Sequence, residues 1–220
     1  MKRISRCWMM MTRNNFSRTY LSLITLLLLF NFLYSEDNLP DVEVVDKVKS
    51  SILSADGRSF KVVWTYEYDG DIWTGEGSMK VLGQDYLKLN LDYQQILIKH
   101  DTLFTRYAET DQVVADWFDR TDPANFFSIL LGEMPGFTLD KVDILTERKI
   151  VVTLRAETMV GFDTLRMIVD RETWLPVSMS AVAGEDIRVD VQIKEAAPLT
   201  NPLELTNEKL TGSEFIDLRE

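Results

Sequence analysis

The period of the hydrophobic positions changes along the chain. After Asn38-Leu39-Pro40-Asp41, which places proline and an acid where a helix begins, Val45, Val48 and Ile52 recur at helical spacing. This pattern predicts a helix that ends near residues 53–57. From Phe60 onward the apolar residues alternate with polar ones, and a period of two predicts strands.

Alternating segments separated by short polar turns fill most of the remaining chain. They predict eleven strands, near residues 60–68, 72–82, 85–91, 94–99, 102–107, 111–117, 138–146, 149–157, 162–170, 175–183 and 187–195. Residues 197–204 are expected to form a loop, and Gly75 and Gly77 mark a bent strand. Because the strands follow one another directly, they predict an antiparallel meander and not alternating β and α units.

One apolar helix is predicted to interrupt the meander at residues 123–131. Asp122-Pro123 is expected to open this helix and Gly132 to close it. Phe126, Phe127 and Leu130, with their neighbours, cover most of its circumference, so the helix must contact apolar surface on more than one side. Two interpretations follow: an ordinary filled core, or a curved sheet whose hollow is covered by this helix.

The N-terminal stretch differs from the rest of the chain. Five basic residues precede Glu36, the first acid, and the apolar run YLSLITLLLLFNFLY occupies residues 20–34. This arrangement predicts a signal peptide over residues 1–35, with an uncleaved N-terminal anchor as the alternative. Cys7 precedes the apolar run, so the chain lacks the cysteine that a lipidated protein carries behind it. Residues 36–220 are expected to form a single domain without disulfides.

The charge balance excludes some partners. The whole chain has a formal net charge of −11, and removal of the five basic residues of the predicted signal peptide leaves −16. Such acidity argues against nucleic acid and against adhesion to anionic membranes.

Catalytic patterns are missing from the sequence. His100 is the only histidine and falls where a turn is expected, while no cysteine follows the signal peptide. No Cys and His set suits zinc, and no glycine-rich phosphate loop follows a strand. We therefore expect no enzymatic activity, no cofactor and no metal site.

Several segments resemble the LolA-like family of periplasmic lipoprotein carriers. They are GEGSMKVLGQDYLKLNL (75–91), QQILIKHDTLFTRYAETDQV (94–113), DPANFFSILLG (122–132), IVDRETWLPVSM (168–179) and SEFIDLRE (213–220). Their order along residues 42–218 carries the resemblance. The chain departs from the family pattern at three points. The lid-holding arginine is replaced here by Gly83-Gln84, the Asp-Gly turn by Lys99-His100-Asp101, which is one residue shorter, and a tyrosine by Arg106.

The resemblance implies a mainly β fold with some α: an unclosed antiparallel β-barrel of about eleven strands covered by short lid helices. It implies an acyl-chain cavity lined by six residues and a lid helix that uses three. The cavity residues are Trp64, Met79, Leu87, Leu89, Leu91 and Phe104, and the lid residues are Phe126, Phe127 and Leu130.

The function implied by the resemblance is the shielding of lipoprotein acyl chains, or another lipid, between the inner and outer membranes of a Gram-negative bacterium. The expected protein is a periplasmic monomer that meets an inner-membrane release complex and an outer-membrane acceptor. A lipid- or lipoprotein-sensing module of the same fold is the main alternative. An exported domain with a solid core, and an enzyme built around His100, remain open.

Overall fold

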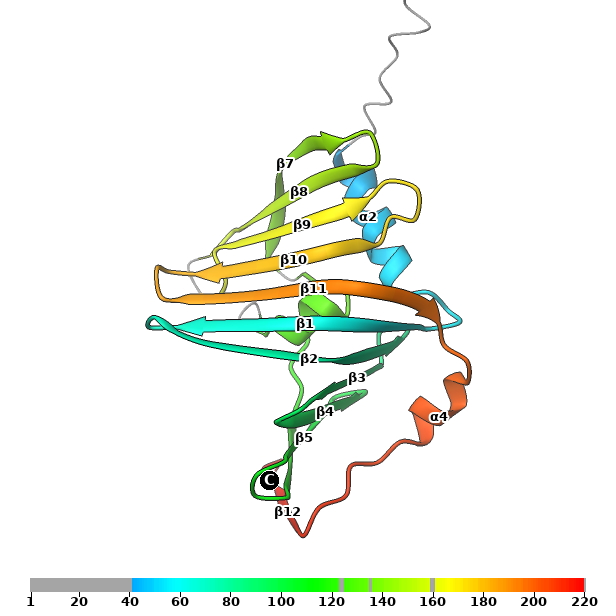
Figure 1. The fold of residues 1–220 in the computed structure, drawn as a ribbon, viewed down its shortest axis with the longest axis vertical. Helices are drawn as coiled ribbons and strands as arrows, with labels where there is room; N and C mark the ends of the chain where they lie inside the picture. Colours follow the sequence, from blue (N-terminus) through cyan, green and yellow to red (C-terminus); the bar gives the residue numbers. More distant parts are fainter. Residues whose placement is uncertain (1–40, 123–124, 135, 159–160, 220) are drawn as a thin grey trace, which may run out of the picture. The chain divides into compact units, whose positions relative to one another are not determined.

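The computed structural model describes residues 41–122, 125–134, 136–158 and 161–219 (Figure 1). Residues 41–220 form one compact unit. The predicted signal peptide, residues 1–35, lies outside the described residues, so it stays a prediction.

The described elements are three short helices and twelve strands. In chain order they are α2 (Asp41–Ile52), β1 (Arg58–Tyr68), β2 (Asp71–Leu82), β3 (Tyr86–Leu91), β4 (Gln94–Lys99), β5 (Thr102–Tyr107), β6 (Gln112–Trp117), α3 (Phe126–Leu130), β7 (Phe137–Thr146), β8 (Lys149–Ala156), β9 (Thr164–Asp170), β10 (Pro176–Ala183), β11 (Ile187–Pro198), α4 (Pro202–Asn207) and β12 (Glu214–Asp217).

All twelve strands belong to one unclosed sheet, in the order β12-β6-β5-β4-β3-β2-β1-β11-β10-β9-β8-β7. Every neighbouring pair is antiparallel except β12 and β6, which are parallel. The predicted fold class, a mainly β unclosed antiparallel sheet with lid helices, is confirmed. The eleven predicted strands correspond to β1–β11.

The sheet has an inner face that is covered and an outer face that is partly open. We define the inner face as the one that carries Phe60, Val62 and Trp64 of β1, all buried, while their neighbours Lys61 and Val63 point the other way. The alternation follows from the two-residue side-chain period of a strand. On α2, Val44, Val48 and Ile52 lie four residues apart and are buried, which gives this helix one apolar side.

Gly77 lets β2 and β3 approach closely. A Cβ atom at Gly77 would collide with the backbone carbonyl of Asn90 and would lie 2.8 Å from Leu91 Cδ2. At Gly75 on the same strand, the nearest atom to such a Cβ is Tyr93 Cε1, at 3.4 Å. Of these two glycines of β2, only Gly77 is therefore required by a close backbone approach.

We expect Gly77→Ala to lower the free energy of unfolding by about 1–3 kcal/mol, because the new methyl group overpacks against a backbone carbonyl that cannot rotate away. Gly75→Ala is the matched control and is expected to cost less than about 1 kcal/mol. Urea denaturation followed by circular dichroism measures both changes. Equal losses for the two variants would contradict the close-approach role of Gly77.

The C-terminal segment crosses the outer face of the sheet, and the sequence pattern did not predict its structure. We call residues 199–217 the strap: after β11 it forms α4 and then β12 at the edge of β6 (Figure 1). Residues 197–204 are not a loop throughout, since residues 197–198 end β11 and residues 202–204 are helical. Pro202 is the first residue of α4, and Leu205 is its buried residue. Six residues are too few to show a helical period in the sequence.

Two lysines and one aspartate hold the strap to the strands below. Lys88 of β3 pairs with the carboxylate of Glu208. Lys99 of β4 donates from Nζ to the backbone oxygens of Thr206, at 2.6 Å, and Glu208, at 3.2 Å. Asp111 accepts hydrogen bonds from Arg106 and, at 3.0 Å, from the backbone N–H of Ser213.

Two of the carboxylates at β12 have lowered pKa values. The hydrogen bond from Arg106 and those from Ser213 lower the pKa of Asp111, and the hydrogen bonds from Arg219 lower the pKa of Asp217 to about 2. A carboxylate whose pKa is lower in the folded state stabilises that state above its unfolded pKa of about 3.9, and the contribution disappears as the pH falls through the folded pKa.

Because Asp111 joins the start of β6 to Ser213 of the strap, we expect β12 to detach as the pH falls below about 4, before the central strands unfold. In a pH titration by amide NMR, cross-peaks of Phe215 and Ile216 should move toward random-coil positions at higher pH than those of β1 and β11. Simultaneous loss of all these cross-peaks would contradict a separate acid-sensitive attachment of β12.

Candidate binding site on the inner face

Five of the six predicted cavity residues lie together on the inner face. Met79 of β2 pairs with Phe60 of β1 on one side and with Leu89 of β3 on the other. Phe60 is on the same face as Trp64, and Leu87 pairs with Val81. Leu91 pairs with Gly77 on the same face. These five side chains are at most 9% exposed, and Ile96 and Ile98 of β4 extend the apolar surface. We call this set from β1 to β4 the inner wall.

Phe104 does not lie with the other five. Phe104 pairs with Leu97, and Leu97 pairs with Lys88, so all three side chains are on the same face. Lys88 lies between Leu87 and Leu89 in β3, so this face is opposite to the inner wall. Phe104 is therefore on the outer face, half-buried, and Leu103 and Thr105 take the inner positions of β5. The resemblance placed Phe104 in the cavity across a turn of different length, and a shift of one residue reverses the face of every side chain in a strand.

The helix α3 covers the inner wall at Trp64. The Phe126 ring meets the Trp64 ring edge-on at 5.2 Å between centroids, and the Phe127 ring stacks on it at 6.4 Å. Phe126 also contacts Phe162 at 5.8 Å, and Leu130 is fully buried. Two of the three predicted lid residues thus contact a predicted wall residue.

The local sequence explains where α3 begins and ends. Asn125 caps the helix, since its side-chain oxygen accepts from the Phe127 N–H at 3.0 Å, so the start is later than the predicted Asp122-Pro123. Gly132, with φ of +69°, follows the helix and donates to Ile129 O at 2.9 Å, as predicted for the residue that closes it. Five residues cannot sustain a helix alone, so α3 depends on its contacts.

Four aromatic residues, three exposed and one half-buried, surround one end of the inner wall. The β1–β2, β3–β4 and β5–β6 turns lie at this end, and we call Tyr66, Trp73, Tyr93 and Tyr107 the aromatic rim. Tyr66 and Trp73 stack at 5.6 Å, while Tyr93 and Tyr107 line an open pocket of about 630 Å³. Burial raises the pKa of Tyr93. The rim was not among the residues predicted from the sequence, although alternation places Tyr66 on the same face as Trp64.

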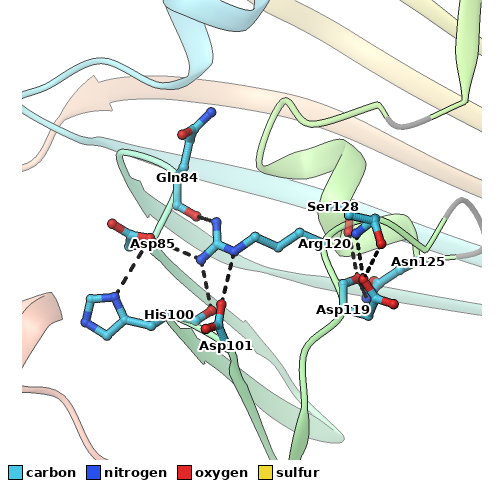
Figure 2. Close-up of polar contacts among 9 residues, drawn as sticks. Gln84, Asp85, His100, Asp101, Asp119, Arg120, Asn125 and Ser128 are labelled. Atoms are coloured by element: carbon cyan, nitrogen blue, oxygen red, sulfur yellow. Dashed lines mark hydrogen bonds and ion pairs between the residues drawn. The ribbon is translucent and has the colours of Figure 1, made fainter.

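At the opposite end of these strands, Arg120 ties the chain ahead of α3 to two turns (Figure 2). Its guanidinium donates to Gln84 O, to Asp85 Oδ1 at 3.1 Å and to His100 O at 2.9 Å, and it lies 3.6 Å from Asp101 Oδ1. The turn at Gln84, which lacks the arginine of the LolA-like pattern, is thus bonded by an arginine from the segment that precedes α3.

Asp119 connects this anchor to the helix. Its backbone oxygen accepts from Asn125 Nδ2 at 3.4 Å and from Ser128 Oγ at 3.5 Å (Figure 2). Residues 119 and 120 thus hold the start of α3 at one end of the inner wall, while the aromatic rim lies at the other end.

His100 lies in the β4–β5 turn, as predicted, with φ of +52°. Its Nε2 is 3.1 Å from Tyr86 Oη, and its side chain is exposed. Within the described part of the chain, no three His, Cys, Asp or Glu residues are grouped so as to hold a metal ion. None of the helices in those same ranges has the length and apolar character needed to cross a bilayer.

Comparison with known proteins identifies the fold. No protein-family model and no curated protein matches the chain. An uncharacterized conserved protein from Thermus thermophilus matches with a TM-score of 0.54 at 10% identity, over 80% of this chain and 97% of its own. At this identity the likeness describes the fold alone.

Two further solved structures have TM-scores below 0.5. A LolA superfamily protein from Nitrosomonas europaea matches at 0.43 and 8% identity, over 77% of this chain and 98% of its own. A lipoprotein-sorting protein domain from Vibrio parahaemolyticus matches at 0.44 and 8% identity, over 74% and 95%. These two scores carry no argument about function. The open antiparallel sheet with its covering helices agrees with the predicted fold class.

We expect Arg120→Gln to loosen α3 without unfolding the sheet, because hydrogen bonds to charged groups contribute about 1.5–3 kcal/mol and those of Arg120 are partly exposed. Amide hydrogen exchange over residues 125–134 should accelerate by about tenfold. Arg148→Gln is the matched control, since Arg148 bonds to Asp170 and Glu172 at a distant turn. Unchanged exchange over residues 125–134 in Arg120→Gln would show that Arg120 does not anchor the helix.

Proposed function

We propose that this protein is a periplasmic carrier that shields acyl chains of lipoproteins, or of another lipid, against the inner wall beneath α3. The observation that carries the proposal is the pairing of a continuous apolar wall with a five-residue helix that covers it mainly through aromatic contacts. A wall of this kind needs no catalytic group to bind hydrocarbon, because apolar burial is non-directional.

An acyl chain and α3 would compete for burial against the same wall. Burial of hydrocarbon contributes about 0.8 kcal/mol per CH₂ group. Each aromatic pair between α3 and Trp64 contributes about 0.5–1.5 kcal/mol beyond its buried area. An acyl chain of several methylene groups can therefore compete with α3 for the same wall. The helix in turn closes the wall when the chain leaves, which lets the carrier release its load.

The two ends of the wall suit different tasks. Arg120 holds the start of α3 at one end, so we expect the helix to swing about that point. The aromatic rim at the other end offers rings that tolerate both water and hydrocarbon, which suits a mouth through which acyl chains enter. The formal net charge of −11 disfavours direct capture from an anionic membrane. We therefore propose loading by an inner-membrane release complex and unloading to an outer-membrane acceptor, with the carrier acting as a monomer.

We expect a synthetic triacylated lipopeptide to bind with 1:1 stoichiometry and to accelerate hydrogen exchange of residues 125–134 while leaving β8–β10 unchanged. Phe127→Ser removes one aromatic pair that competes with the ligand. It should tighten binding about threefold to tenfold, the equivalent of about 0.5–1.5 kcal/mol. Fluorescence anisotropy with a labelled lipopeptide measures the affinity.

Phe104→Ser is the matched control, because Phe104 is also a half-buried phenylalanine but lies on the outer face. Its lipopeptide affinity should equal that of the unmodified protein. The proposal fails when lipopeptide does not bind, or when it binds without any change in hydrogen exchange at α3.

A further inference from the structure

A second apolar pocket lies on the outer face, between the sheet and the strap. Its apolar lining consists of Leu97 and Phe104 from β4 and β5 and of Leu210 and Phe215 from the strap. Its volume is about 400 Å³, within the range of about 300–1,000 Å³ that small-molecule sites occupy. We call it the strap pocket. Because the sheet separates it from the inner wall, one ligand cannot fill both sites.

The polar edge of the strap pocket has an excess of positive charge. Lys99, Lys209, Glu208 and Thr102 lie there. The Glu208 carboxylate is engaged by Lys88, which is largely buried. Lys99 donates two hydrogen bonds to uncharged backbone oxygens, which leaves one of its three N–H donors for another acceptor. In a chain as acidic as this one, a pocket with two lysines and an already paired carboxylate is unusual.

The combination of walls and edge defines the ligand chemistry. Apolar side chains on both sides favour a hydrocarbon chain, and the lysine edge favours an anionic group at its end. A hydroxyl end group would gain less from Lys99, because hydrogen bonds between charged partners are roughly twice as strong as neutral ones. A cationic end group would be repelled.

We propose that the strap pocket binds a free medium-chain fatty acid, with its carboxylate at Lys99 and Lys209 and its chain between Phe104 and Phe215. This site is independent of the carrier function proposed for the inner wall. Since the ligand contacts strap and sheet together, its binding stabilises the attachment of the strap.

The test uses octanoate, octanol and octyltrimethylammonium as probes of equal chain length, titrated into the protein and followed by NMR. Octanoate should bind about tenfold more tightly than octanol, and octyltrimethylammonium more weakly than both. Nuclear Overhauser contacts from octanoate methylene protons should reach the Phe104 and Phe215 rings. The β12 amides should exchange more slowly when octanoate is bound.

Variants separate the charge from the apolar walls. Lys99→Gln and Lys209→Gln should each reduce the preference for octanoate over octanol, and together they should abolish it. Lys209 is exposed, so its replacement tests the charge even where Lys99→Gln loosens the strap. Leu210→Trp should weaken all three probes by filling the pocket. Lys149→Gln, at an exposed lysine on β8, is the control and should change nothing.

Three outcomes would overturn the proposal: no octanoate binding, equal binding of the three probes, or Overhauser contacts to Trp64 in place of Phe104. The last outcome would place octanoate on the inner wall and would support the carrier function alone. Octanoate contacts to Phe104 combined with a failure of lipopeptide to bind would instead retain the strap pocket and remove the carrier proposal.

Discussion

The two-residue period of the strands decides which side chains each face of the sheet receives. It divides one twelve-stranded sheet into a buried inner face and a partly open outer face, and the register carries this division from β1 to β6. Leu89 and Leu97 show its effect. Both are buried, yet Leu89 belongs to the inner wall and Leu97 lines the strap pocket on the other face. Two apolar sites can therefore exist on one sheet without sharing a residue.

The covering of the inner wall is local and therefore reversible. A five-residue helix has little stability of its own, and α3 is held by Trp64, by its Asn125 cap and by the chain leading from Arg120. The strands beneath it are joined by continuous ladders, so the helix can leave while the sheet persists. The proposed carrier cycle uses this difference in stability, with the anchor at one end of the wall and the aromatic rim at the other.

The sequence predicted the strands well and the polar anchors poorly, for a physical reason. Alternation is written into each strand, so β1–β11 and the inner positions of Leu87, Leu89 and Leu91 could be read directly. The contacts of Arg120 join turns more than 15 residues apart in sequence, and no local pattern encodes such an encounter. The parallel pairing of β12 with β6 is equally non-local. Phe104 was predicted on the wrong face of the sheet. The face of a strand residue depends on the length of the preceding turn, which the resemblance did not determine.

Native mass spectrometry of the protein, purified without detergent from the cells that produce it, tests whether the inner wall carries acyl chains. A carrier should retain a fraction of its load, so we expect a second species heavier by the mass of a lipid or lipoprotein. The heavier species should give up its load when excess triacylated lipopeptide is added. A bare polypeptide mass in every preparation, with no uptake of added lipopeptide, would show that the protein is not a carrier of acyl chains.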